Sequence, residues 1–73
     1  MYEFIFANNK FYDVFWSNKE ELDYAEVIYE SKAKVSEPIK LDAKNNKIVY
    51  SEAPSGDYSV EYYFVDLNGK RYE

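Results

Sequence analysis

The side chains that could do chemistry in this chain are carboxylates, because its 73 residues include no His and no Cys. Without those residue types there is no Ser-His or Cys-His pair, no thiolate nucleophile and no ordinary zinc site. Paired carboxylates can still act as general acid and base, but no pair stands out from a solvated surface. The only glycines, Gly56 and Gly69, form no phosphate-binding loop. We therefore expect a protein that is not an enzyme and that uses no cofactor and no metal.

The charge balance narrows the choice of partner. Fourteen acidic residues outnumber nine basic ones, which gives a formal net charge of −5 at pH 7. A surface of that sign repels nucleic-acid phosphate and anionic lipid, and it favours a basic partner. The basic residues are scattered, so the electrostatic footprint of a nucleic-acid-binding protein is missing. We expect a protein partner, and no direct contact with nucleic acid or membrane.

The length fits a single domain spanning residues 1–73, because a chain of this size buries only about 60% of its unfolded surface. Aromatic residues make up 21% of the chain, enough to fill a core and to leave a surplus for a partner. The first seven residues lack the basic start and apolar run of a signal peptide, and no apolar stretch approaches the ~20 residues of a membrane span. We expect a cytoplasmic protein.

Two strands are predicted at the start of the chain. Residues 2–6 and 11–16 are rich in β-favouring side chains, and they are joined through Asn8 and Asn9, which tolerate the left-handed conformation of a tight turn. In such a hairpin Phe6 faces Phe11, and Asp13 interrupts an otherwise aromatic face. We expect Asp13 to lie near a sheet edge, where its carboxylate reaches water.

A helix is predicted over residues 18–34. Ser17 and Asn18 are each followed three residues later by Glu, as in a capping box, and acids crowd the first turns while lysines crowd the last. The apolar residues on one arc of the helical wheel are Leu22, Ala25, Ile28, Tyr29 and Ala33. The alternative is a strand, because a period of two is followed by Ala25, Val27, Tyr29, Ala33 and Val35. We favour the helix because cap, charge gradient and arc agree.

Two further hairpins are predicted after the helix. Residues 39–41 and 47–51 flank a turn at Asn45 and Asn46. Residues 57–66 and 70–73 then flank the turn Asn68-Gly69, the strongest short hairpin pattern in the chain.

The last hairpin fixes a register and a place in the sheet. Its turn pairs Asp66 with Arg71, as an ion pair, and Val65 with Tyr72. Residues 58–65 are apolar on both faces, so this strand should lie centrally. The predicted fold is α+β: an antiparallel sheet of about five to six strands in the order ββαββββ, with one helix packed on one face. One helix cannot cover both faces, so the open face should be exposed, paired with a second copy or bound to another protein.

Three short stretches of the chain resemble the phage uracil-DNA glycosylase inhibitor family, whose members are small acidic proteins that imitate DNA to block a repair enzyme. They are Ser51-Glu52-Ala53-Pro54, Asp66-Leu67-Asn68-Gly69, and Asp13-Val14-Phe15 followed by Glu20-Glu21-Leu22. The likeness covers roughly residues 13–70. The chain departs from the family where Asp13 replaces Glu and where strand 2–6 takes the place of the first helix.

The resemblance implies a function and a site. The chain would be a DNA mimic that blocks a host protein with a basic DNA-binding groove, in the host cytoplasm if a phage encodes it. Asp13, on an exposed strand edge, would stand in for DNA phosphate, while Glu20 and Glu21 would meet the polar DNA-binding groups of the glycosylase. The apolar pocket for the intercalating side chain of that enzyme would be lined by Leu22, Ala25 and Val49.

Two alternatives stay open beside the inhibitor. One is a protein-binding or homodimerising module without mimicry. The other is an immunoglobulin-like β-sandwich piece, because residues 56–60 (Gly-Asp-Tyr-Ser-Val) through Asp66-Leu67-Asn68-Gly69 also resemble the closing hairpin of bacterial immunoglobulin-like repeats. Helix content distinguishes the sandwich from the other hypotheses.

Overall fold

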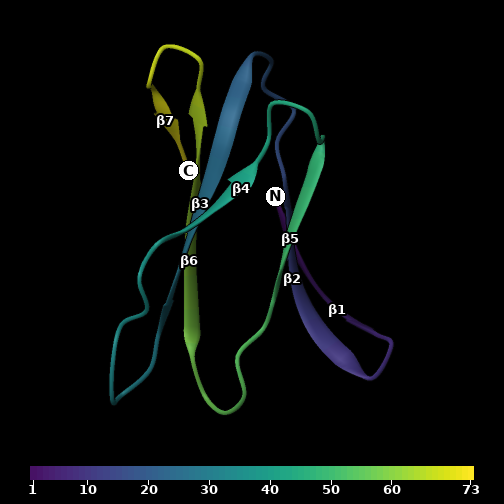
Figure 1. Cartoon of the computed structure of the whole chain (residues 1–73), viewed down its shortest axis with the longest axis vertical. Coiled ribbons are helices and arrows are strands. Elements are labelled where there is room, and N and C mark those ends of the chain that lie inside the picture. The colour runs from purple at the N-terminus through teal and green to yellow at the C-terminus, as the bar shows by residue number, and fades with distance from the viewer.

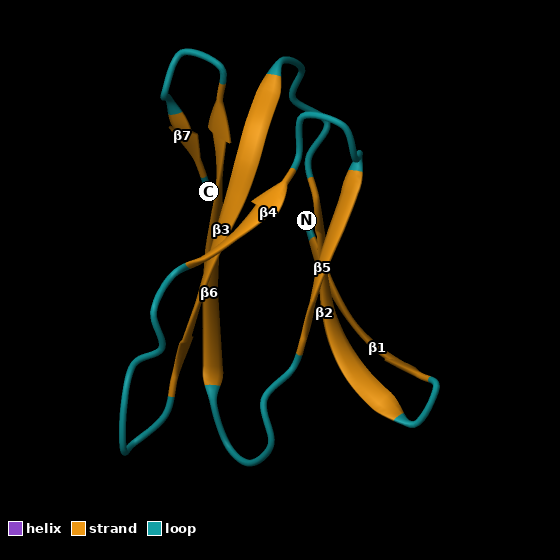
Figure 2. Ribbon diagram, viewed as in Figure 1, coloured by secondary structure: helices purple, strands orange, loops and turns teal.

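The computed structural model describes residues 1–73 and contains seven strands and no helix. The strands are β1 (Tyr2–Ala7), β2 (Lys10–Trp16), β3 (Leu22–Glu30), β4 (Ile39–Asp42), β5 (Ile48–Glu52), β6 (Ser59–Asp66) and β7 (Arg71–Tyr72). They form two antiparallel sheets, in the orders β1-β2-β5 and β4-β3-β6-β7. The sheets face each other as a β-sandwich (Figure 2). The predicted α+β fold is therefore wrong, and the protein is all-β, with one antiparallel sheet of three strands and one of four.

Residues 22–30 form strand β3, where the sequence favoured a helix. Ala25, Val27 and Tyr29 are buried, and the residues between them are only half-buried. The period of two prevails because the opposite sheet covers one face of this strand and takes up alternate side chains. Ser17 Oγ accepts a hydrogen bond of 3.1 Å from the backbone N of Lys19, which makes a local turn in place of a helix cap.

The N-terminal hairpin agrees with its prediction. Asn8 and Asn9 both have positive φ, 53° and 64°, as a two-residue type I′ turn requires. Phe6 pairs with Phe11, and Phe4 pairs with Asp13. The turn end of this hairpin curves away from the four-stranded sheet (Figures 1 and 2). Strand β5 pairs with β2 only from Tyr12 onward, so the turn end also extends past β5.

The predicted middle hairpin does not form, although both of its strands, β4 and β5, exist. β4 pairs with β3 in one sheet, and β5 pairs with β2 in the other. The chain crosses between the sheets after β2, after β4 and after β5 (Figure 1). This crossing lets Leu41 and Val49 pack into the same core from opposite sheets, which a hairpin within one sheet would not allow.

The C-terminal hairpin forms, but its register differs from the prediction by one residue. Val65 pairs with Arg71, and Phe64 pairs with Tyr72. The cause is a three-residue loop: Gly69 N donates to Asp66 O at 3.0 Å, and Gly69 then takes a φ of 85°, which adds a bulge. The predicted ion pair between Asp66 and Arg71 is therefore absent. β6 lies between β3 and β7, as its apolar faces predicted.

Apolar side chains from both sheets meet in one core between them. Its buried members are Phe15, Ala25, Val27, Tyr29, Ala43, Val49 and Phe64. The structure has no helix that could cross a membrane.

Candidate functional site

Asp13 does not lie on an exposed edge. It sits on β2, the middle strand of its sheet, and its relative exposure is 0%. The expected position of Asp13 is therefore wrong, and its carboxylate cannot stand in for a phosphate on the surface. The period of two along β2 could have indicated this burial, because it puts Asp13 on the same inner face as Phe15.

Tyrosine hydroxyls surround the buried carboxylate of Asp13. Tyr2 donates a hydrogen bond to Oδ1, and Tyr29 donates one of 2.8 Å to Oδ2. Burial, followed by hydrogen bonding to Asp13, raises the pKa of Tyr2. Burial also raises the pKa of Tyr29, a rise that Asp13 strengthens and the Ser51 hydroxyl opposes. For Tyr58, burial and then the charge of Asp13 raise the pKa.

This network connects the two sheets. Tyr2 and Asp13 belong to the three-stranded sheet, whereas Tyr29 belongs to the four-stranded sheet and Tyr58 lies directly before β6. A buried charge is tolerated only when hydrogen bonds compensate it, and here hydroxyls from both sheets do so. We assign Asp13 a structural role, as a polar link inside the sandwich.

Two of the residues expected to line an apolar pocket are closed into the core. Ala25 is 0% exposed and Val49 is 4% exposed, and they lie in different sheets. No opening for an intercalating side chain is formed by this pair. Leu22 packs against the core and is half-buried.

Glu20, Glu21 and Leu22 do come together, at the end of the sandwich where three loops meet (top of Figure 1). They line a hollow of about 580 Å³ with residues of the β4–β5 loop and with Leu67. The residues of the rim that carry charge are Lys19, Glu20, Glu21, Lys44 and Lys47. Three cations beside two carboxylates do not reproduce the continuous negative charge of a DNA backbone.

Hydrogen bonds hold these loops in place. Leu67 N donates to Glu21 O at 2.9 Å, which connects two of them. The Asp42 carboxylate accepts bonds from Lys44 N and Asn45 N, at 2.9 and 3.2 Å. The Asn45 side chain, and then its backbone, hold the pKa of Asp42 below its usual value. Glu21 has a φ of 58°, which is uncommon for a residue with a side chain.

Most of the exposed large hydrophobic side chains lie elsewhere, on the N-terminal hairpin. Eleven large hydrophobic residues are exposed, and six of them belong to the first eleven residues: Met1, Tyr2, Phe4, Ile5, Phe6 and Phe11. Phe4 stacks on Phe11 with ring centroids 5.0 Å apart, and Phe6 contacts Phe11 at 4.8 Å. We call these three residues the phenylalanine cluster. The aromatic content predicts a surplus but not its place, because the period of two puts the cluster on the same face as buried Phe15.

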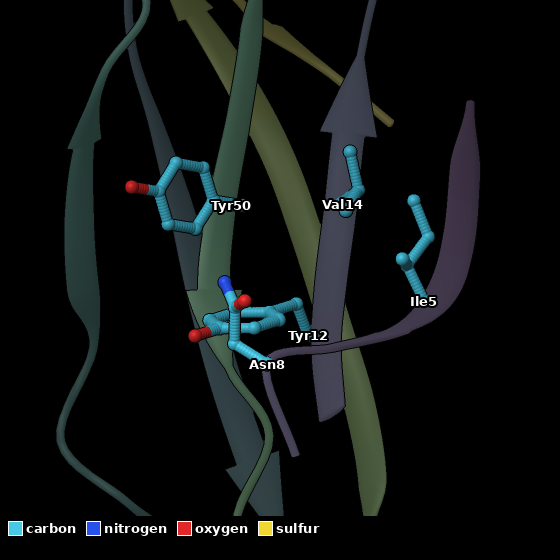
Figure 3. Close-up of a pocket in the computed structure, with 5 residues that line it drawn as sticks. All are labelled: Ile5, Asn8, Tyr12, Val14 and Tyr50. Atoms are coloured by element: carbon cyan, nitrogen blue, oxygen red, sulfur yellow. The ribbon is translucent and has the colours of Figure 1, made fainter. Parts of the chain in front are cut away.

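The outer face of the same sheet is also apolar. Ile5, Tyr12, Val14 and Tyr50 line a shallow hollow of about 290 Å³, with Asn8 at its edge (Figure 3). The rings of Tyr12 and Tyr50 meet edge to face, with centroids 5.7 Å apart. The hairpin therefore exposes apolar groups on both of its faces.

The outer face of the four-stranded sheet is different, because cations cover its tyrosines. Lys40 Nζ lies 4.5 Å from the ring centre of Tyr24, and the Arg71 guanidinium lies 3.7 Å from that of Tyr63. Such contacts shield the rings with the chain's own side chains. Apolar exposure is thus concentrated on the three-stranded sheet.

Neither a metal site nor a similar protein points to another function. No group of three His, Cys, Asp or Glu side chains is arranged to hold a metal ion. Comparison with protein-family models, with curated proteins and with solved structures finds no match to this chain.

Proposed function

We propose that this chain is a protein-binding module without catalytic activity, and that it binds its partner through the N-terminal hairpin. The observation that carries the proposal is the gathering of six of eleven exposed large hydrophobic residues in the first eleven positions. Contiguous exposed apolar surface of this kind marks interaction sites on soluble proteins. Aromatic residues are also the type most enriched at the centres of protein interfaces.

The backbone of the hairpin supports the same conclusion. β1 is an edge strand, so one side of it has no hydrogen-bonding partner. It has no Pro and no Lys, the residues that commonly protect such an edge. An extended segment of a partner can add to such an edge, with main-chain hydrogen bonds giving affinity and the flanking side chains giving selectivity.

The DNA-mimicking inhibitor has less support. It requires carboxylates beside an apolar pocket, yet Asp13 is buried and Ala25 and Val49 are closed in the core. Glu20 and Glu21 stay at the surface, but lysines share their rim. That hypothesis stays a prediction, and an assay of uracil excision from a duplex oligonucleotide with excess chain tests it directly.

Site-specific photocrosslinking in cells that express the protein tests the proposal. A benzophenone side chain replaces Phe6, which is 59% exposed, or Leu67, which is 52% exposed and belongs to the loop end. We expect a defined crosslinked protein band from position 6 and none from position 67. A band from position 67 alone would assign the site to the loops instead, and equal labelling from both positions would contradict a specific hairpin site.

A further inference from the structure

The open edge of β1 presents a regular set of unpaired backbone groups. Trp16 N donates to Met1 O at 3.0 Å, and Met1 N donates to Trp16 O at 2.7 Å. Because backbone groups alternate in direction along an antiparallel strand, the odd-numbered residues of β1 also bond to β2. Tyr2, Phe4 and Phe6 therefore turn their N–H and C=O groups toward the open edge.

We propose that this edge pairs with β1 of a second copy of the chain, antiparallel and centred on Phe4. The proposal rests on the function proposed above and names the partner of that surface. In this register Phe4 faces its own counterpart and Tyr2 faces Phe6, so that about six hydrogen bonds form around a twofold axis. The two three-stranded sheets become one six-stranded sheet.

The side chains fit a second copy as well as the backbone does. Residues directly opposite each other in an antiparallel pair project from the same face. Phe4 and Phe6 of both copies then form one aromatic row, with Phe11 beside it in each copy. This arrangement packs Phe4 and Phe6 of one copy beside those of the other, on a face that the four-stranded sheet leaves open.

The exposed area is large enough for a modest dimer. The six exposed residues of the hairpin are between 37% and 59% accessible. At about 200 Å² for each side chain they expose roughly 600 Å² per chain, which sets an upper limit of about 1,200 Å² on the apolar area that a pair can bury. That limit lies at the lower end of stable interfaces, so we expect weak association, with a dissociation constant of about micromolar magnitude or weaker.

The distribution of charge favours a second copy over a basic partner at this surface. Residues 1–12 contain one acidic side chain, Glu3, and one basic side chain, Lys10, so the net charge of −5 lies in residues 13–73. Lys10 Nζ already lies 3.7 Å from Glu52. The contact therefore brings no excess of like charge together, while the rest of the two chains repel each other at long range.

Sedimentation equilibrium of the purified full chain, from about 1 to about 500 μM, tests the pairing. We expect a monomer–dimer equilibrium that strengthens between about 50 mM and about 500 mM NaCl, because salt screens the repulsion. A basic partner would bind more weakly over the same range. Phe4→Lys should weaken the dimer at least tenfold, whereas Leu67→Lys should not, although the two side chains are 50% and 52% exposed.

Two measurements separate edge pairing from loss of the fold. Circular dichroism should show the same strand content in both lysine variants. Synthetic chain with an N-methyl group on Phe4 keeps the ring and loses only the outward N–H, and it should also be monomeric. Amide exchange followed by NMR should show protection at Phe4 and Phe6 that rises with concentration, while protection at Ile5 stays constant.

Three outcomes would overturn the proposed pairing of β1 with a second copy of the chain. A wild-type chain that is monomeric at the highest concentration excludes it, and a crosslink from position 6 to another protein would then still support the proposed function. If Phe4→Lys does not weaken the dimer, the dimer interface lies on another surface of the chain. A dimer that N-methylation leaves intact excludes edge pairing.

Discussion

At the scale of single residues, Asp13 shows how a buried charge can stabilise a small sandwich. Its carboxylate accepts hydrogen bonds from Tyr2 and Tyr29, residues of opposite sheets. The chain has no disulfide to hold its sheets together. Bonds to an ionised acceptor are roughly twice as strong as neutral ones, so one residue contributes to the contact between both layers.

Removal of this carboxylate should destabilise the fold. Asp13→Ala removes the acceptor of the part-buried Tyr2 hydroxyl and of the buried Tyr29 hydroxyl, and we expect the free energy of unfolding to fall by about 2–4 kcal/mol. Asp13→Asn should cost less, because the amide oxygen still accepts one bond. Urea unfolding measures both changes. Asp57→Ala, at an exposed carboxylate without a hydrogen bond, is the control and should change stability little.

Because Tyr2 and Tyr29 ionise less readily in the folded chain, the free energy of unfolding should depend on pH in the alkaline range. Burial and Asp13 raise the pKa values of Tyr2 and Tyr29 above 10.0, the ordinary value. Above about pH 10 the unfolded chain releases tyrosine protons that the folded chain keeps. The contribution of these two tyrosines to the free energy of unfolding is therefore fully present below that pH and is lost as the pH rises above it. Urea unfolding from about pH 8 to about pH 12 should show this loss.

The slope of that pH dependence identifies the groups responsible. Tyr29→Phe should reduce the slope above pH 10, because one proton fewer distinguishes the folded chain from the unfolded chain. Leu67→Ala alters a residue that is 52% exposed and carries no ionisable group, and it should leave the slope unchanged. Equal slopes in all three proteins would show that the alkaline transition has another cause.

At the scale of elements, β3 shows where local sequence and tertiary structure disagree. The helical arc includes Ile28 and leaves out Val27, whereas the strand buries Val27 and leaves Ile28 half-buried. Val27→Ala should therefore cost about 2–3 kcal/mol of unfolding free energy, and Ile28→Ala less than about 1 kcal/mol. Equal costs from denaturant unfolding would support the helical pattern.

Glu21 offers a second test at this scale, because its φ of 58° is strained for a residue with a side chain. Glu21→Gly should raise the free energy of unfolding by up to about 1 kcal/mol. Glu20→Gly removes the same charge at a position without positive φ, and it should lower stability through loss of chain entropy. Thermal unfolding of both variants should show a higher melting temperature for Glu21→Gly and a lower one for Glu20→Gly.

Local patterns predicted the turns better than they predicted the pairing of strands. Asn8 and Asn9 determine the first hairpin and its register, because both residues accept positive φ. The order of strands in the sheets depends on which side chains share the core, and that is a property of the whole chain. For the same reason Asp13 could be placed on an aromatic face, but its burial depends on Tyr29, sixteen residues away.

At the scale of the whole molecule, the small core is the main constraint. Nine of the 73 residues are buried, and one of these is Asp13. Core burial in so short a chain commonly supplies no more than about 3–5 kcal/mol of stability. A sandwich of this kind therefore gains much from any contact that covers its exposed aromatic residues, and association and folding should be coupled.

The melting temperature should therefore rise with protein concentration. If the folded chain is a dimer and the unfolded chain a monomer, a hundredfold rise in concentration stabilises each chain by about 1.4 kcal/mol. For a domain of this size that corresponds to a shift of roughly 5–10 °C. Scanning calorimetry at two concentrations measures the shift. Phe4→Lys should melt at one temperature at both concentrations, whereas Leu67→Lys should shift as the wild type does. A wild-type melting temperature that does not change with concentration would show that the folded chain gains no stability from pairing through β1.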